Sequence, residues 1–84
     1  MEVEFTKHAA EKFLEEVYVK DVKITKKKIF SVIEKPAFKK RQGEKIFAVG
    51  DLAQRHVLVV IYKKVGKRAK VITFFPARKG RYES

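Results

Sequence analysis

The segment His56–Lys63 (HVLVVIYK) constrains the fold of this chain more than any other. Its residues are nearly all apolar and mostly β-branched, a composition typical of a strand that is buried on both faces of a sheet. The apolar stretch inside it, Val57–Tyr62, is far too short to cross a bilayer. The segment therefore predicts the central strand of a sheet and argues against a membrane span.

Two further strands are expected beside it, at Lys45–Val49 and Ala69–Phe75. The first is followed by glycine and the second by proline, residues that commonly end strands. The turn Lys64–Lys67 suits a hairpin, so the three strands should form an antiparallel meander. The polar segment 37–44 is expected to be a basic loop that leads into this meander.

The segment before these strands is expected to hold a short strand and two helices. Polar and apolar residues alternate over Glu2–Phe5, which indicates a half-exposed strand. Thr6 and Thr25 stand where N-caps should be, and helices are expected at about 7–18 and 26–34, the second ended by a proline. The inward-facing apolar positions at helical spacing are Ala10, Phe13, Leu14, Val17, Ile29, Val32 and Ile33.

The order β-α-α-β-β-β predicts a single α+β domain, residues 1–84, with two helices packed on one face of an antiparallel sheet. With 84 residues and no cysteine, the chain must fold without a disulfide or a Cys-based zinc site. Its first residues do not resemble a signal peptide, so we expect a cytoplasmic protein. Asparagine is absent while lysine and glutamate are abundant, a bias typical of heat-adapted proteins.

Net charge is the strongest compositional signal. The chain has 21 Lys and Arg against 10 Asp and Glu, a formal net charge of +11. Residues 1–20 contain three lysines and five glutamates, whereas residues 21–84 contain 18 basic and five acidic groups. Such a field attracts nucleic acid first, anionic membrane second and an acidic protein third. Nucleic acid is therefore the expected partner, with lysine-rich solubilisation as the alternative explanation.

Several familiar catalytic arrangements are missing from the sequence. The only serines are Ser31 and Ser84, so a serine triad has no plausible nucleophile. His8 and His56 have no partner at metal-ligand spacing, so neither a metal nor another cofactor is expected. What remains is a set of Arg, Lys, Tyr and His side chains around a sheet. Metal-independent RNA cleavage could use such a set, because RNA supplies its own nucleophile, the 2′-hydroxyl.

The C-terminal half carries a resemblance to a known superfamily. Arg55 opens a strand, Val71–Thr73 lies in the last strand, and Arg78–Tyr82 forms an Arg-Lys-rich tail with a late aromatic residue. Together with the helix opening Thr6–Ala9 and the helix end Glu34–Pro36, this pattern resembles the RelE/ParE toxins. It is most similar to BrnT-like toxins and to a related uncharacterised family whose first helix begins with His-Ala. The resemblance runs over nearly the whole chain.

The resemblance implies the toxin of a type II toxin–antitoxin system, an endonuclease of free or ribosome-bound mRNA that an acidic antitoxin neutralises. It places Arg55, Arg78 and Tyr82 around the cleaved phosphate, with Lys45 in the place of a basic strand residue. Arg78 is expected to stabilise the phosphorane and Arg55 to position the phosphate. Strand alternation would direct Arg55 and His56 to opposite faces. Phosphate contacts are expected from Lys26, Lys27, Lys28, Lys39, Lys40, Arg41, Lys79 and Arg81.

Two other functions stay open. ParE-like relatives keep the fold but act on gyrase, so a RelE-like fold alone does not imply a nuclease. The chain could be a non-catalytic nucleic-acid-binding module, or an interaction protein whose positive surface serves only an acidic partner. A binding module needs spread charge and exposed aromatic rings, for which Phe38, Phe74 and Phe75 are candidates, although core packing explains the last two more simply. No membrane partner is expected.

Overall fold

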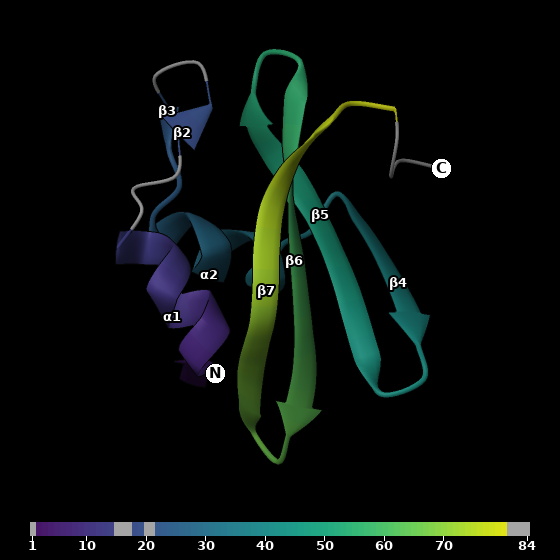
Figure 1. Cartoon of the computed structure of the whole chain (residues 1–84). Coiled ribbons are helices and arrows are strands. Elements are labelled where there is room, and N and C mark those ends of the chain that lie inside the picture. The colour runs from purple at the N-terminus through teal and green to yellow at the C-terminus, as the bar shows by residue number, and fades with distance from the viewer. Residues whose placement is uncertain (1, 15–17, 20–21, 81–84) are drawn as a thin grey trace.

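The computed structural model describes residues 2–14, 18–19 and 22–80. Within them the chain order is β1 (Glu2–Phe5), α1 (Lys7–Leu14), β2 (Tyr18–Val19), β3 (Val22–Lys23), α2 (Lys26–Glu34), β4 (Phe38–Gln42), β5 (Lys45–Ala53), β6 (His56–Val65) and β7 (Arg68–Arg78). A five-stranded mixed sheet has the order β1-β7-β6-β5-β4, and β2 and β3 pair separately. In Figure 1 the helices lie beside and behind this sheet, with α2 passing behind β7 and β6.

The predicted meander and its central strand are confirmed. Strand β6 pairs antiparallel with β5 on one side and with β7 on the other. Its apolar residues alternate between the two faces of the sheet, and Val57, Leu58, Val59 and Val60 are all at most 1% exposed. A continuous apolar run was therefore the correct signal for a strand in the middle of the sheet.

Both helices begin where the sequence predicts. The Thr6 hydroxyl accepts a hydrogen bond from the Ala9 amide at 3.2 Å, and the Thr25 hydroxyl accepts one from the Lys28 amide at 3.1 Å. Helix α2 has the expected bounds and buries Ile29, Val32 and Ile33. Helix α1 is described over Lys7–Leu14, and it does not reach the expected end at about residue 18. Residues 15–17 lie outside the described part of the chain, and Tyr18 already belongs to β2.

The sequence suggested a purely antiparallel sheet, but the sheet is mixed. Strand β1 runs parallel to β7 and pairs with its first residues, Arg68–Val71. The alternation of Glu2–Phe5 identifies a strand but carries no information about its direction. That direction is set by the helices, which return the chain to the far edge of the sheet and leave β1 beside the last strand.

Residues 37–44 do not form the expected loop, because Phe38–Gln42 is the edge strand β4 and pairs with β5. Lysine is common on edge strands, where charge discourages pairing with other chains, so the basic composition concealed the strand. Strand β7 also continues through Pro76 to Arg78. Since β1 pairs only with the start of β7, Pro76 has a strand neighbour on one side alone, a place where proline is tolerated.

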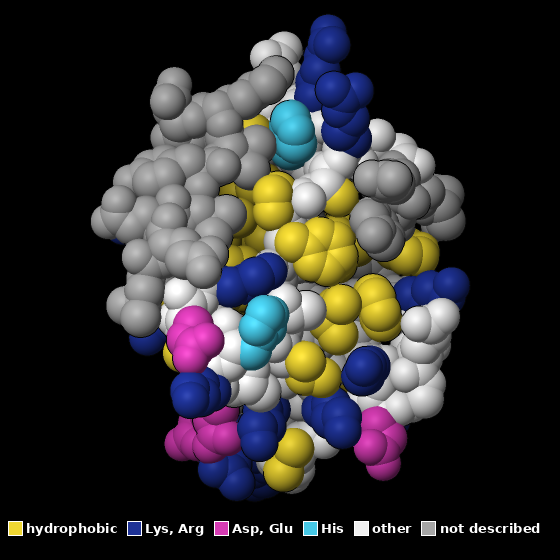
Figure 2. Space-filling model, in the orientation of Figure 1, with side chains coloured by type: hydrophobic (Ala, Val, Ile, Leu, Met, Phe, Trp, Pro, Cys, Tyr) yellow, Lys and Arg dark blue, Asp and Glu magenta, His cyan; other side chains and the backbone are white. Residues whose placement is uncertain are grey.

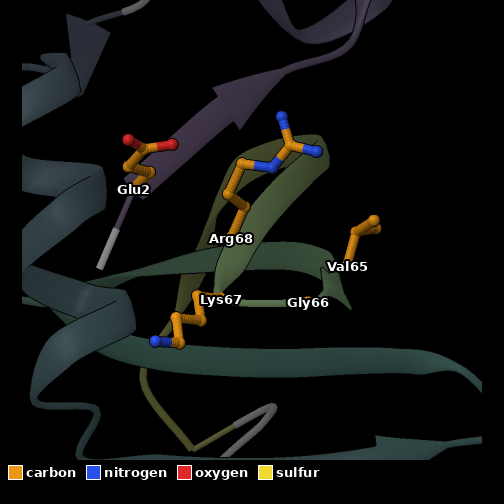
Figure 3. A pocket seen from close by; sticks show the side chains of 5 residues that line it. All are labelled: Glu2, Val65, Gly66, Lys67 and Arg68. Carbon is orange, nitrogen blue, oxygen red and sulfur yellow. The ribbon is translucent and has the colours of Figure 1, made fainter.

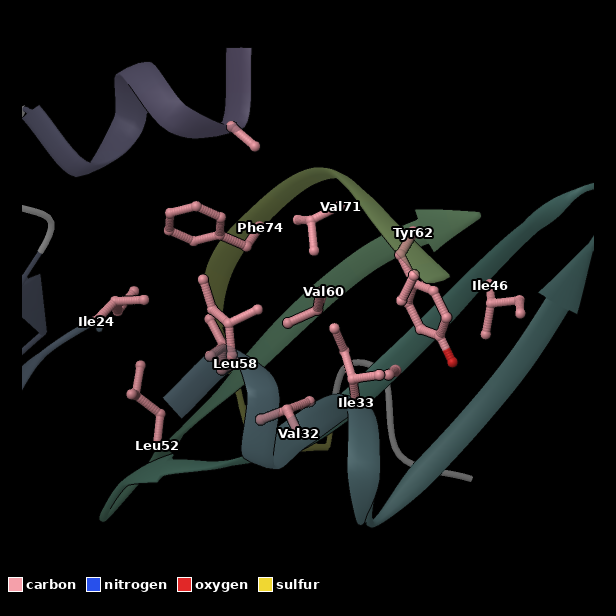
Figure 4. Packing of buried hydrophobic residues seen from close by; sticks show 14 residues of the cluster. Ile24, Val32, Ile33, Ile46, Leu52, Leu58, Val60, Tyr62, Val71 and Phe74 are labelled. Carbon is pink, nitrogen blue, oxygen red and sulfur yellow. The ribbon is translucent and has the colours of Figure 1, made fainter. Parts of the chain in front are cut away.

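The two faces of the sheet hold separate apolar clusters. The helix-covered face carries the main core, which contains the buried α2 residues together with Leu58, Val60, Tyr62 and Phe74 (Figure 4). Gly50 lies on this face, where an added Cβ would sit 2.8 Å from a methyl group of Val32, so glycine allows α2 to approach β5 closely. No helix within the described residues is long and apolar enough to span a membrane.

The opposite face, called the open face below, carries a smaller cluster. None of its described members comes from a helix. Val49, Val57 and Val59 are buried in it, with half-buried residues packed around them: Phe38, Phe47, Ile61, Phe75 and Ala77. In Figure 2 hydrophobic side chains gather in the middle of the face turned to the viewer, with Lys and Arg side chains around them.

Candidate active site

One end of the sheet brings together side chains that lie apart in the sequence. The β5–β6 turn at Gln54–Arg55 meets the end of β7, and the Lys79 amide donates a hydrogen bond to the Arg55 carbonyl at 3.0 Å. His56 and Arg78 are directly opposite each other across β6 and β7. A hollow of about 360 Å³ at this end is lined by Gln54, Arg55, His56, Arg78 and Lys79.

Arg55 and His56 line the same hollow, contrary to the expectation from strand alternation. Alternation applies only within a strand, and β6 begins at His56, which leaves Arg55 in the preceding turn. The imidazole Nδ1 of His56 is buried and has no hydrogen-bond partner among the described residues. Leaving such a nitrogen unpaired costs about 1–3 kcal/mol. Because Nδ1 is buried, proton exchange with a ligand in the hollow would have to use the other ring nitrogen, Nε2.

The hollow is positively charged. Arg55 and Arg78 are both exposed, and neither forms an ion pair within the described residues. The carboxylate of Asp51 lies 3.4 Å from the ammonium group of Lys79, but this pair is largely exposed and contributes little to stability. The two guanidinium groups are thus available for an anion, and their planar donors suit the oxygens of a phosphate.

Lys45, which the resemblance also assigned to cleavage, does not join this cluster. Lys45 begins β5 and pairs with Lys63, whereas the hollow lies beyond the other end of β5. Eight residue steps separate Lys45 from Ala53, which corresponds to roughly 26 Å along the strand. Tyr82 lies outside the described residues.

The expected phosphate-contact residues are spread over several surfaces. On α2, the Lys26 ammonium group lies 5.5 and 5.6 Å from the ring centroids of Phe5 and Phe13, a cation–π position. Lys27 is exposed and Lys28 is half-buried on the same helix. Lys39, Lys40 and Arg41 are exposed on β4, and Lys79 lines the hollow, while Arg81 lies outside the described residues.

The sequence did not predict that His56 would line this hollow. From the sequence, His56 is expected to face away from Arg55, and its spacing from His8 argues against a metal site. The sequence signal for its position was the start of an apolar strand directly after a turn, which places a strand's first residue at the sheet end. The other histidine, His8, is exposed on α1.

A second hollow, of about 570 Å³, lies at the β6–β7 hairpin and is lined by Glu2 and residues 65–68 (Figure 3). The Arg68 guanidinium already pairs with the Glu4 carboxylate. The lining of this hollow contains no histidine, so it lacks the neutral proton acceptor that the hollow at His56 has. No group of three or more His, Asp, Glu or Cys that could hold a metal ion occurs in the described part of the chain.

Comparison with known proteins gives no relative for this chain. No protein-family model, curated protein or solved structure matches it.

Proposed function

We propose that this chain is a metal-independent endoribonuclease that serves as the toxin of a type II toxin–antitoxin system on a RelE-like fold. The observation that carries the proposal is the convergence of Arg55, His56 and Arg78 in one hollow. RNA cleavage through the 2′-hydroxyl needs a proton-transfer group beside cationic groups that stabilise phosphate charge. The imidazole and the two guanidinium groups are side chains of those two kinds.

In this mechanism the scissile phosphate lies between Arg55 and Arg78. The 2′-oxygen attacks the neighbouring phosphorus, and His56 accepts the 2′-hydroxyl proton. Arg78 stabilises the charge of the pentacovalent phosphorane, while Arg55 holds the phosphate in line. The bond from phosphorus to the 5′-oxygen breaks, and the departing oxygen takes a proton from water. The products are a 2′,3′-cyclic phosphate and a 5′-hydroxyl end.

The partner in this proposal is an acidic antitoxin protein. A formal net charge of +11 in a chain of 84 residues provides the attraction, and an antitoxin would neutralise it. Expression of the toxin in the cytoplasm should then arrest growth unless the antitoxin is present. Co-purification with the product of the adjacent gene tests this part of the proposal. A protein that stays monomeric beside its gene neighbours and does not arrest growth would contradict it.

The cleavage itself is tested with two oligonucleotides of one sequence. One is single-stranded RNA, and the other carries 2′-deoxyribose throughout and therefore lacks the nucleophile. The proposal expects cleavage of the RNA alone, in the presence of EDTA, with cyclic phosphate at the new 3′ ends. Cleavage of the deoxy strand, or a requirement for divalent metal, would contradict the mechanism.

The second candidate is a non-catalytic nucleic-acid-binding module. The half-buried aromatic residues of the open face favour it, because exposed rings and spread charge suffice for binding. Salt-dependent RNA binding without any cleavage of naked or ribosome-bound RNA, and without growth arrest, would select this candidate.

A further inference from the structure

The open face carries a row of lysines across three neighbouring strands. Lys45 of β5 is directly opposite Lys63 of β6, which is opposite Lys70 of β7. Residues two positions apart on a strand share a face. Lys45 therefore lies on the open face with Phe47 and Val49, and Lys63 lies there with Ile61 and Val59. Lys70 is directly opposite Lys63 and shares its face. Adjacent strands are about 4.8 Å apart, so three positive charges follow one another at short spacing.

Like charges directly opposite each other destabilise a sheet. Two carboxylates lie near the row, and neither cancels it. Glu44 is 3.5 Å from the ammonium group of Lys63, but its side chain is 86% exposed. Glu4 is beside Lys70 at the other end of the row, where it pairs with Arg68. The row is therefore a surface on which an anionic ligand would relieve repulsion.

A small hollow adjoins this row at the β4 edge. It has a volume of about 230 Å³ and is lined by Phe38, Lys40, Gln42, Phe47 and Val49. Lys40 is opposite Phe47, and Gln42 is opposite Lys45, so the hollow and the lysine row are continuous. Its walls combine two aromatic rings, an amide and an ammonium group, which suit a planar ring with hydrogen-bonding edges and a phosphate beside it.

We propose that the hollow at Phe38 and Phe47 is a base-binding subsite for single-stranded RNA, with the lysine row holding the adjoining phosphates. This subsite would bind the substrate of the proposed endoribonuclease. The identification of the bound strand as a substrate rests on that proposed function. Lys63 and His56 are seven residue steps apart on β6, roughly 23 Å. The lysine row is thus too far from the candidate cleavage site to touch the reacting phosphate, and together with the hollow it determines which strands bind.

Single-stranded RNA fits this surface better than an acidic protein or a duplex. A protein partner would pair carboxylates with the lysines but would leave the amide and ammonium groups of the hollow without a matching ring edge. In a duplex the bases are stacked and paired, and they cannot enter a hollow lined by Phe38 and Phe47. A single strand offers both phosphates and free base faces.

The test measures binding separately from cleavage. The probe is a fluorescein-labelled 12-nucleotide 2′-O-methyl strand, which cannot be cleaved, with the same strand in a duplex for comparison. Wild-type protein should bind the single strand at least tenfold more tightly than the duplex. The variant Lys45→Gln/Lys63→Gln/Lys70→Gln should lose at least tenfold in affinity, and the slope of log affinity against log salt should fall by about 2. The matched control, Lys7→Gln/Lys35→Gln/Lys67→Gln, removes three exposed lysines elsewhere and should change affinity much less.

The hollow has its own variant, Phe47→Leu, which keeps an apolar side chain but removes the flat ring. Loss of stacking should weaken binding by at least fivefold. Phe30→Leu is the control, because Phe30 is 41% exposed on α2. If the native strand is cleaved, Phe47→Leu should raise KM and leave kcat unchanged.

Equal losses in the lysine variant and its control would overturn the subsite. So would preferential binding of polyglutamate that depends on the same lysines and on Phe47, which would assign the surface to an acidic protein. The binding result stands whether or not the chain cleaves RNA, so failure of the subsite and failure of the nuclease are distinguishable.

Discussion

The two faces of the sheet are built from the same strands but differ in how their side chains are buried. On the helix-covered face, Leu58, Val60, Phe74 and their neighbours are buried beneath α1 and α2. On the open face, the apolar cluster is smaller, its aromatic members are half-buried, and lysines border it. The first arrangement accounts for stability, since burial of apolar area is the main favourable term in folding. The second leaves aromatic rings and charge accessible to a ligand.

The largest expected difference between the faces is in the stability lost when Phe74 or its neighbour Phe75 is replaced by alanine. Phe74 is 1% exposed in the main core, whereas Phe75 is half-buried on the open face. Phe74→Ala should lower the free energy of unfolding by about 3–5 kcal/mol, the usual cost of deleting a buried aromatic ring. Phe75→Ala should cost clearly less, because less area leaves an apolar environment. Urea unfolding of both variants measures the difference, and equal losses would show that the open face is as much a core as the other.

A smaller effect is expected where α2 meets the sheet. Gly50→Ala places a Cβ 2.8 Å from a Val32 methyl group, so the helix or the strand must shift. Overpacking of this kind costs about 1–3 kcal/mol. The double variant Gly50→Ala/Val32→Ala should lose less than the sum of the two single variants, because the second change removes the clashing methyl group. Thermal unfolding of all three variants tests this, and strict additivity would mean that the close approach does not limit packing.

The smallest expected effect is on the pH dependence of stability, and it concerns Tyr62 on the helix-covered face. Burial raises the pKa of the Tyr62 hydroxyl above its ordinary value. The neutral side chain is then favoured in the folded protein, so its contribution to stability is complete below the unfolded pKa of about 10. That contribution is lost as pH rises through the folded pKa. Tyr62→Phe should therefore lose less stability than the wild type between pH 8 and pH 11. Urea unfolding at several pH values measures this. The same decrease in the free energy of unfolding with rising pH in the wild type and the variant would contradict the expectation.

Much of the fold followed from local sequence patterns. The apolar run at 57–62 located the central strand, and Thr6 and Thr25 located the starts of both helices. Patterns that depend on distant partners were not visible. The direction of β1 and the pairing of β4 are fixed by tertiary packing, and the exposed, basic sequence of β4 lacks the apolar alternation that indicates a strand.

The candidate site was only partly visible in the sequence. The tail resemblance indicated Arg55 and Arg78, and the structure places both around one hollow. The position of His56 beside Arg55 was not predicted, because strand alternation separates the two residues only if both belong to the strand. The strand begins at His56, and boundaries of this kind are uncertain by a residue or two. The lysine row could not be read from the sequence, because Lys45, Lys63 and Lys70 become neighbours only through strand register.

Single-turnover cleavage of a single-stranded RNA tests most directly the proposal that the end of the sheet at His56 and Arg78 is a cleavage site. Arg78→Ala should reduce the rate about 100- to 1,000-fold while urea unfolding stays unchanged, because in the proposed mechanism this side chain stabilises the phosphorane, and it is exposed and not part of the core. Arg78→Lys should restore little, since an ammonium group cannot reproduce the planar donors of guanidinium. His56→Ala should be similarly slow, and Lys67→Ala in the distant hairpin should cleave at nearly the wild-type rate. Wild-type cleavage that survives both Arg78→Ala and His56→Ala would contradict the assignment of this site.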